Sequence, residues 1–253
     1  MFTCPLFPQS CLFRGWLFGF QPAVRAPLKM SKRLFDLFFS VVGLLVLSPL
    51  LLLLAVLVKA SDGGSVFFRQ LRIGQDGSPF HIVKFRTMVQ NAEQFGLSVT
   101  RDGDARITRV GRFLRKTKLD ELPQLWNVLV GDMSFVGPRP EVARYVEHYT
   151  AEQKRVLTLK PGITDLATLT FRREEELLRT AGRRRRTEDG EREAADVEAF
   201  YMEHCVPRKI ELNLAYADTA NVWEDLKIIL RTLRLLLGTE FRGQSAKDGG
   251  EHE

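Results

Sequence analysis

An almost unbroken apolar stretch from Leu34 to Val58, LFDLFFSVVGLLVLSPLLLLLAVLV, constrains the fold more than any other feature of this chain. Its 25 residues would form a helix of about 37 Å at ~1.5 Å per residue. The hydrocarbon core of a bilayer is about 30 Å thick, so the segment is long enough to cross it. Length and composition alone therefore predict a transmembrane helix.

Two details of the same segment favour a different path through the membrane. Pro49 lies in its middle and lacks a backbone N–H, so we expect a kink or break there, and the hydroxyl of Ser48 can satisfy a freed carbonyl. Basic residues flank both ends, Lys32 and Arg33 before it and Lys59 after it, so the positive-inside rule gives no direction. A re-entrant helix that bends at Ser48-Pro49 and returns to the same face is slightly favoured over a spanning one.

The first 29 residues, MFTCPLFPQSCLFRGWLFGFQPAVRAPLK, are rich in Pro, Phe and Cys and show neither helical nor strand periodicity. They lack the basic start, apolar run and small-residue cleavage site of a signal peptide. Met30 directly precedes the SKRLFD run. Residues 1–29 are therefore either an N-terminal extension, amphipathic or unstructured, or lie upstream of a true translation start at Met30, and both alternatives stay open.

The rest of the chain divides by composition into several parts. We expect the membrane helix at 30–60 and a compact domain at 61–179 and 197–240, followed by a disordered tail at 241–253. Between the two parts of that domain lies a low-complexity insert at 180–196, TAGRRRRTEDGEREAAD. Its arginines could mark a nucleic-acid patch, but the acids that follow them favour a solvated flexible loop.

The compact domain is predicted to be mixed, mainly α with a small β-hairpin. Residues 66–89 predict the hairpin, because two apolar runs flank a turn at Gly74–Gly77. Residues 90–105 are polar and predict a surface loop. Apolar spacing and turn signals predict helices at 106–118, 121–130 and 141–158.

A last helix is predicted near the C-terminus. One of its faces is apolar and is formed by Val222, Leu226, Ile229, Leu233 and Leu236. Its basic residues, Lys227, Arg231 and Arg234, lie elsewhere on the helix. Such a helix can pack on the domain or rest on an anionic membrane surface, and the sequence does not decide between them.

The charge balance favours a phosphate-bearing partner or an anionic membrane surface. The net charge is +6, and the segment from Lys84 to Lys118 contains nine basic and three acidic residues. A nucleic-acid partner is disfavoured, because no recognisable binding module or aromatic interleaving accompanies the basic residues. Three cysteines, Cys4, Cys11 and Cys205, show no metal-like spacing and predict no disulfide framework, which is typical of a reducing compartment.

Asp120 and Glu121 stand side by side at a predicted helix start, within KTKLDELPQLWNVLVGDMSFVGPRP at 116–140. Asp is a preferred N-cap and Glu in a first turn complements the helix dipole, so such a pair seen alone is more often structural. Pro123 fits the same helix start, because its missing N–H has no helical partner there.

The arginines around the acidic pair change that balance. Arg112 and Arg115 precede it at helical spacing, and Arg139 follows in a GPRP turn whose two prolines fix the backbone. Guanidinium groups bind phosphate oxygens in a bidentate manner. A divalent cation would offset the repulsion between the carboxylates and a diphosphate, and Mg²⁺ suits this because it needs few protein carboxylates. The stretch therefore predicts an anion site.

These residues resemble a known family, the bacterial sugar transferases, which are monotopic phosphoglycosyl transferases that start polysaccharide and glycoprotein glycan assembly. The matching pieces cover nearly all of 31–167, and the 104–140 block is highly specific. They are KRLFD at 32–36, SP at 48–49, RIGQDGSPFHIVKFRTM at 72–88, DARITRVGRFLRKTKLDELPQLWNVLVGDMSFVGPRP at 104–140 and PGITDLA at 161–167. The ending PRKIELNLAYADTANVWEDLKIILRTL is also similar to the family's close.

The resemblance implies transfer of a sugar 1-phosphate from a nucleotide diphospho-sugar, usually UDP-linked, to polyprenyl phosphate with release of UMP. It places the nucleophile at Asp120. This carboxylate would form a phosphosugar-enzyme intermediate, and the reaction would require Mg²⁺. The neighbouring Glu121 would support metal binding or positioning, so both acids are candidate metal ligands. The family's arginines fall on Arg115 and Arg139.

Further expectations follow from the same resemblance. Lys84 and Arg86 of KFRTM are added as second-line phosphate contacts, and Arg112 stays a candidate phosphate-binding residue because of its spacing before the acidic pair. The membrane helix becomes re-entrant at Ser48-Pro49, which leaves both its ends cytoplasmic. The chain would then be monotopic, in contact with membrane lipid at the cytoplasmic face of the bacterial inner membrane. Whether it forms a homo-oligomer stays open.

The sequence departs from the family after PGIT, where many members read GLAQ and this chain reads DLAT from Asp165 to Thr168. That region bears on the donor, so the sugar, the nucleotide and the glycan pathway are not predicted. The alternative function is a membrane-anchored, non-catalytic binding or scaffold protein, whose acidic pair only caps a helix.

Overall fold

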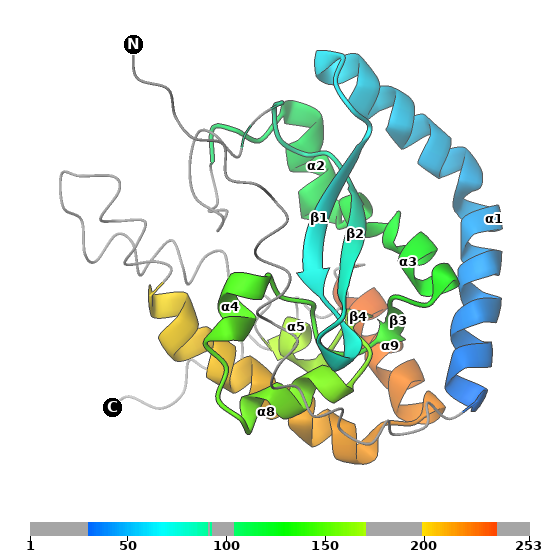
Figure 1. Cartoon of the computed structure of the whole chain (residues 1–253). Helices are drawn as coiled ribbons and strands as arrows, with labels where there is room; N and C mark the ends of the chain where they lie inside the picture. The colour runs from blue at the N-terminus through cyan, green and yellow to red at the C-terminus, as the bar shows by residue number, and fades with distance from the viewer. Residues whose placement is uncertain (1–29, 91, 93–103, 171–198, 237–253) are drawn as a thin grey trace, which may run out of the picture.

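The computed structural model describes residues 30–90, 92, 104–170 and 199–236 (Figure 1). The predicted N-terminal extension, charged insert and C-terminal tail, and most of the predicted loop at 90–105, lie outside these residues. The described part is mainly helical with two small sheets. The predicted mainly α class is confirmed, whereas only one of the two sheets was predicted.

The apolar segment forms one continuous helix, α1 (Met30–Asp62), with Pro49 inside it. Of the predicted kink or break, the break does not occur, and Figure 1 shows a helix that bends without interruption. The hydroxyl of Ser48 donates a hydrogen bond of 2.8 Å to the carbonyl oxygen of Leu45. That carbonyl stands four residues before Pro49 and would otherwise lack a partner, so the predicted role of Ser48 is confirmed.

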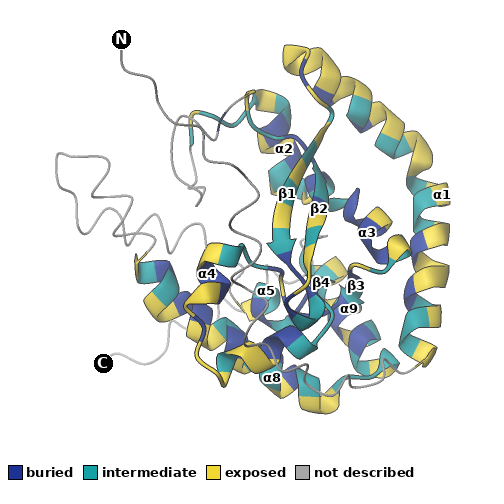
Figure 2. Ribbon diagram, viewed as in Figure 1, coloured by how far each residue is buried: buried dark blue, intermediate teal, exposed yellow. Residues whose placement is uncertain are grey.

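The outer side of α1 is not covered by the rest of the molecule. Only 11% of its most apolar 18-residue window is buried, whereas the core helix of a soluble protein would be mostly buried. Leu45, Val46 and Leu52 are 70%, 71% and 68% exposed, and Figure 2 shows the exposed side running along the helix. Within the described residues, α1 is the only helix long and apolar enough to cross a membrane.

Both ends of α1 contact the same domain. At its C-terminal end, Leu54 and Val58 are buried against Phe85 and Leu114. At its N-terminal end, Lys32 donates a hydrogen bond to the carbonyl of Val136, which lies 104 residues further along the chain. The helix therefore lies along one side of the domain (Figure 1).

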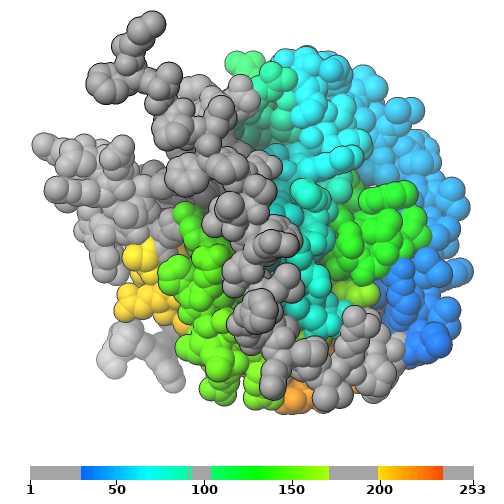
Figure 3. Space-filling model, viewed as in Figure 1, coloured from blue at the N-terminus to red at the C-terminus, as the bar shows by residue number. Residues whose placement is uncertain are grey.

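The predicted hairpin is confirmed. Strands β1 (Phe67–Ile73) and β2 (Pro79–Phe85) pair antiparallel, with Phe67 opposite Phe85. Asp76 lies in the connecting turn at a φ of 55°, a left-handed conformation that Asp adopts more easily than most residues. In the space-filling view, the hairpin reaches the surface between α1 and α3 on one side and α4 on the other (Figure 3).

A second sheet was not predicted. It consists of two parallel strands, β3 (Ser134–Val136) and β4 (Gly162–Thr164). Just past β3, a Cβ added to Gly137 would lie 2.1 Å from the carbonyl oxygen of Lys160. A Cβ on Gly162 would lie 2.1 Å from the amide nitrogen of Gly137. Only glycine fits at both positions, which brings the GPRP turn into contact with the chain at β4.

Short helices surround these sheets. They are α2 (Arg109–Thr117), α3 (Gln124–Val130), α4 (Ala143–Glu147), α5 (Leu166–Thr170), α8 (Val206–Thr219) and α9 (Val222–Leu236). Shorter 3-10 turns lie at Leu119–Glu121 and Gln153–Thr158, and a π-helical turn at Tyr201–Cys205 precedes α8.

The single helix predicted at 141–158 is wrong. The chain leaves α4 after Glu147 and starts a new turn at Gln153. Thr150 and Gln153 form a reciprocal pair: the amide of Thr150 donates to Oε1 of Gln153, and the amide of Gln153 donates to Oγ1 of Thr150. This capping box satisfies the first N–H groups of a new helical turn, so it starts a second element.

Helix α9 is confirmed, but its buried face differs from the predicted one. Asp225 and Ile228 are buried, whereas Leu233 on the predicted apolar face is 48% exposed. Thr232 reaches Thr164 of β4 through a 2.8 Å hydrogen bond between their hydroxyls. Helix α9 thus packs on the domain through a partly polar face, and its exposed residues include the basic Lys227, Arg231 and Arg234 as well as the apolar Trp223, Leu230 and Leu233.

Candidate active site

The acidic pair lies in the 3-10 turn Leu119–Glu121, between α2 and α3. Lys118 precedes it at a φ of 58° and ends α2 in a left-handed conformation. Such a conformation is costly for a residue with a long side chain, and residues of this kind cluster at functional sites. The turn at Lys118 redirects the chain so that Asp120 and Glu121 face the domain.

Glu121 is held by two cations from distant parts of the chain. Its Oε1 accepts hydrogen bonds from Nζ of Lys84 at 2.8 Å and from Nη2 of Arg139 at 2.9 Å. The Glu121 side chain is 11% exposed, whereas that of Arg139 is 40% exposed. The structure therefore brings together three of the predicted site residues, from β2, the turn before α3 and the turn after β3.

Asp120 is buried but not held. It is 8% exposed, and its Oδ1 has no hydrogen-bond partner among the described residues. The cap position of α3 is Pro123, and no side chain caps that helix. Asp120 is therefore not a capping residue here, which removes the main structural explanation for the pair.

The pKa values of the two acids shift in opposite directions. Burial and the neighbouring charge of Glu121 raise the pKa of Asp120, although Lys84, Lys118 and Arg115 oppose the shift. Burial also acts to raise the pKa of Glu121, but Arg139, Lys84 and Lys118 outweigh it and hold that pKa well below its usual range. Glu121 is thus an ionised partner of two cations, and Asp120 is the more basic carboxylate.

The other predicted arginines differ in whether they interact with this pair. The charge of Arg115 acts on Asp120, and its buried Nη1 has no partner in the described part of the chain. Arg112 lies exposed on α2, and its side chain makes no hydrogen bond or ion pair with the described residues. Arg86 is ion-paired with Asp62 at the end of α1. The structure thus brings Arg115 to the pair but does not place Arg112 or Arg86 there.

Two residues that the sequence analysis missed support the site. The carboxylate of Asp165 accepts the amide of Arg139 at 3.2 Å and the side-chain amide of Asn213 at 3.1 Å. Asn127 on α3 accepts the amide of Val83 at 3.0 Å and donates to the carbonyl of His81 at 2.8 Å, which fixes the strand that carries Lys84. The signal for Asp165 was its place in the departure from the family's GLAQ.

Gln124 is a third residue that was missed. It is the first residue of α3, four positions after Asp120, is 2% exposed and has a side-chain nitrogen without a partner among the described residues.

Few protein ligands are available for a metal. Among the described residues, no group of three or more His, Cys, Asp or Glu side chains could hold an ion. Mg²⁺ keeps several water or substrate ligands and needs only one or two carboxylates, so the pair is sufficient for it. The free Oδ1 of Asp120 fits such a ligand, whereas Oε1 of Glu121 is already occupied by Lys84 and Arg139.

The fold and the site together indicate a membrane-associated enzyme that acts on an anionic substrate. An apolar helix lies along one side of a compact domain, and cationic side chains surround a buried acidic pair. The profile described as "Bacterial sugar transferase" matches residues 28–239. The chain belongs to this family.

Several curated relatives align over most of the chain. A UDP-glucose:undecaprenyl-phosphate glucose-1-phosphate transferase of Caulobacter vibrioides is 36% identical over 222 residues, which cover 87% of this chain and 74% of the relative. The uncharacterized sugar transferase EpsL of Bacillus subtilis is 37% identical over 209 residues, covering 83% and 88%.

Other relatives are longer. A UDP-N-acetylgalactosamine-undecaprenyl-phosphate N-acetylgalactosaminephosphotransferase of Aeromonas hydrophila is 36% identical over 209 residues, which are 81% of this chain but 43% of the relative. The chain thus spans less than half the length of that relative.

Proposed function

We propose that this protein transfers a sugar 1-phosphate from a nucleotide diphospho-sugar, with UDP as the nucleotide carrier, to polyprenyl phosphate, and that UMP is released. Such a step would begin the assembly of an exopolysaccharide, an O-antigen or a protein-linked glycan. The observation that carries the proposal is the buried, unpartnered carboxylate oxygen of Asp120 inside a cationic cluster. The relatives named for UDP-sugars and undecaprenyl phosphate support the choice of substrates.

The reaction takes place in two displacements at phosphorus. The Asp120 carboxylate attacks the phosphorus that bears the sugar, a P–O bond to Asp120 forms, and the bond to UMP breaks. A phosphate oxygen of polyprenyl phosphate then attacks the same phosphorus and releases Asp120 as a carboxylate. The raised pKa of Asp120 makes its carboxylate a better nucleophile than an ordinary Asp.

The cations have separate tasks in this scheme. Arg139 and Lys84 hold Glu121 ionised, and the 40% exposed Arg139 side chain can also reach a diphosphate oxygen. Arg115 has a buried N–H without a partner beside Asp120, so it can donate to the phosphate under attack. Asp120 and Glu121 would hold Mg²⁺, which when bound neutralises phosphate charge.

The proposed membrane path of α1 is re-entrant. A straight spanning helix leaves its two ends on opposite sides of the bilayer. Here Lys32 near one end and Val58 near the other both contact the same domain. This arrangement supports a helix that enters and leaves at one face, and with it a monotopic protein on the cytoplasmic face of the membrane.

The test is UMP release from a panel of UDP-sugars, including UDP-glucose and UDP-N-acetylgalactosamine, by the protein in lipid nanodiscs with Mg²⁺ and undecaprenyl phosphate. We expect Asp120→Asn to reduce UMP release by at least about 10³-fold, because an amide cannot form the phosphoryl bond. The matched control Asp76→Asn, in the hairpin turn, should keep wild-type activity, because Asn also accepts a left-handed conformation.

Chelation of Mg²⁺ provides a second measurement in the same assay. EDTA should abolish UMP release, and added Mg²⁺ should restore it. Near-normal turnover by Asp120→Asn would exclude Asp120 as the nucleophile. If the wild type releases no UMP from any donor and chelation changes nothing, the binding or scaffold alternative is favoured instead.

A further inference from the structure

The first two turns of α1 carry three charged residues that all point into the domain. Lys32, Arg33 and Asp36 lie at the start of a helix whose other side is apolar and exposed. Asp36 is 1% exposed, although it stands within an apolar run. Charged groups are buried in this way only when they have specific partners, so the contacts of each side chain are informative.

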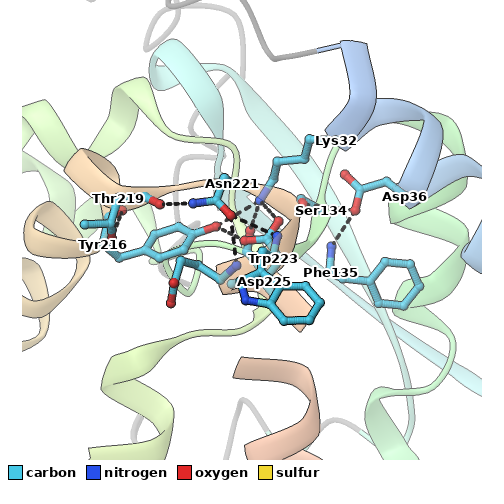
Figure 4. A network of polar contacts seen from close by, with 11 residues as sticks. Lys32, Asp36, Ser134, Phe135, Tyr216, Thr219, Asn221, Trp223 and Asp225 are labelled. Carbon is cyan, nitrogen blue, oxygen red and sulfur yellow. Dashed lines mark hydrogen bonds and ion pairs between the residues drawn. The ribbon is translucent and has the colours of Figure 1, made fainter. Parts of the chain in front are cut away.

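Asp36 holds strand β3. Its Oδ1 accepts the hydroxyl of Ser134 at 3.1 Å and the amide of Phe135 at 3.2 Å. Figure 4 shows Asp36 directed at the backbone of this strand. Lys32 reaches the same strand at its last residue, where its Nζ donates to the carbonyl of Val136 at 3.0 Å. The GPRP turn and Arg139 follow directly.

Arg33 holds α3. Its Nη1 and Nη2 donate to the carbonyl oxygens of Val128 at 2.7 Å and Leu129 at 2.8 Å. These carbonyls lie in the last turn of α3, where the helix itself provides no N–H partner and where its dipole favours a cation. The opposite end of α3 begins at Gln124, with two residues between it and the acidic pair.

The two elements held by α1 therefore carry the two halves of the site. Helix α3 extends from the acidic pair, and β3 leads to Arg139. Near their junction, Gly131 at a φ of 99° lies beneath the Arg33 guanidinium: a Cβ there would be 3.3 Å from Nη2. The contact between Arg139 and Glu121 across the site depends on how α3 and β3 are placed relative to each other.

We propose that Arg33 and Asp36 are positioning residues, which fix α3 and β3 against the start of the membrane helix and so set the reach of Arg139 to Glu121. The geometric part of this proposal stands on the contacts alone. Its consequence for donor binding rests on the proposed function.

The test compares Asp36→Leu with Asp36→Asn in the full chain in lipid nanodiscs. Asn keeps a side-chain oxygen that can accept from Ser134 and Phe135, whereas Leu has a similar volume and no acceptor. The readout is hydrogen exchange of the Gly137 and Arg139 amides, which bond to Thr164 and Asp165 and do not touch Asp36.

We expect both amides to exchange about tenfold faster in Asp36→Leu and within about twofold of wild type in Asp36→Asn. The amides of β1 should not change in either variant. Lys59→Met, which removes a charge at the other end of α1, is the control for effects of helix insertion and should leave both site amides unchanged.

Three results would overturn the positioning role: unchanged exchange at Gly137 and Arg139 in Asp36→Leu, equal acceleration of the β1 amides, or the same acceleration in Asp36→Asn. If Asp36→Leu does not fold, Ser134→Ala removes one of the two contacts from the β3 side and should give about threefold faster exchange. No change in that variant would equally overturn it.

The positioning role also predicts a change in the kinetics of the reaction. With a donor that the wild type uses, Asp36→Leu should raise KM about tenfold and change kcat by less than about threefold, because Arg139 binds the diphosphate before the chemical step. Asp36→Asn should restore KM. If the wild type uses no donor, the proposed function fails, whereas the exchange result still tests whether Arg33 and Asp36 are positioning residues.

Discussion

At the scale of single residues, two adjacent carboxylates occupy opposite electrostatic environments. Glu121 shares one oxygen between Lys84 and Arg139, and its pKa is lowered. Asp120 is buried without a partner for Oδ1, and its pKa is raised. Groups whose environments separate their pKa values in this way commonly have separate chemical roles.

Replacement of each carboxylate by the corresponding amide should therefore change the free energy of unfolding in opposite directions at the two positions. At pH 7, Asp120→Asn should raise the free energy of unfolding, because it removes a buried charge with an unpaired oxygen. Glu121→Gln should lower it by about 2–3 kcal/mol, because Lys84 and Arg139 lose their ionised partner. Urea unfolding of both variants in detergent micelles measures this, and a change of the same sign in both would contradict it.

The pH dependence has opposite signs too. A raised pKa in the folded state means that native Asp120 disfavours ionisation, so the advantage of Asp120→Asn appears as pH rises above the ordinary Asp range and through the raised value. A lowered pKa means that Glu121 contributes stability above its ordinary pKa, which is lost as pH falls through the lowered value. The cost of Glu121→Gln should thus shrink below about pH 4.

Much of this site could be predicted from the sequence, because Arg115, the acidic pair and Arg139 lie in one contiguous block at 104–140 and Lys84 lies in the KFRTM piece. The partner of Arg86 could not be predicted, since Asp62 is brought to it only when the end of α1 packs on the hairpin. Asn127 and Asp165 were missed for a similar reason: both act on the site through backbone groups of other segments.

At the scale of elements, α1 combines a proline with an uninterrupted helix. Its bend is tolerated because the Ser48 hydroxyl satisfies the carbonyl of Leu45. The sequence could predict this local chemistry, but it could not predict that both ends of the helix would rest on one domain. That depends on contacts over about a hundred residues, such as Lys32 with Val136.

The proposed re-entrant path of α1 predicts the outcome of a labelling experiment. Ser31→Cys and Ser61→Cys, both at exposed positions, are introduced separately after Cys4 and Cys11 are changed to Ser. In intact spheroplasts neither should react with a membrane-impermeant maleimide, and both should react once the membrane is opened. Reaction of one of the two in intact spheroplasts would restore a spanning helix.

Short elements were the hardest to predict. Strands β3 and β4 have three residues each, too few to show an alternating pattern, and they pair only because glycines at 137 and 162 allow close approach. The division of the predicted helix at 141–158 had a visible signal in the TAEQ capping box, but the apolar spacing continues across it.

At the scale of the whole molecule, the first and last described helices are joined by a buried ion pair. Nζ of Lys32 lies 2.5 Å from Oδ2 of Asp225, and their side chains are 13% and 2% exposed. Tyr216 of α8 also contacts both residues (Figure 4). Helix α1 thus meets the two consecutive helices α8 and α9, which lie far from it in sequence, at one buried polar centre.

This centre should show strong coupling. Asp225→Leu leaves Lys32 buried without its partner and should cost about 3–5 kcal/mol of unfolding free energy. The double variant Lys32→Met/Asp225→Leu should recover most of that loss, because two apolar side chains replace the pair. Urea unfolding of the two single variants and the double variant provides the cycle. Additive losses would show that the pair is not coupled.

The contact of both ends of α1 with one domain has a kinetic consequence. Under the proposed membrane path and the proposed function, it fixes the height of Asp120 relative to the lipid, so the acceptor arrives by lateral diffusion while the donor arrives from bulk water. The concentration of the acceptor is then a number of molecules per membrane area, whereas the concentration of the donor is a number per volume of solution. Adding inert lipid at constant amounts of protein and acceptor should slow only the second displacement, through dilution in two dimensions.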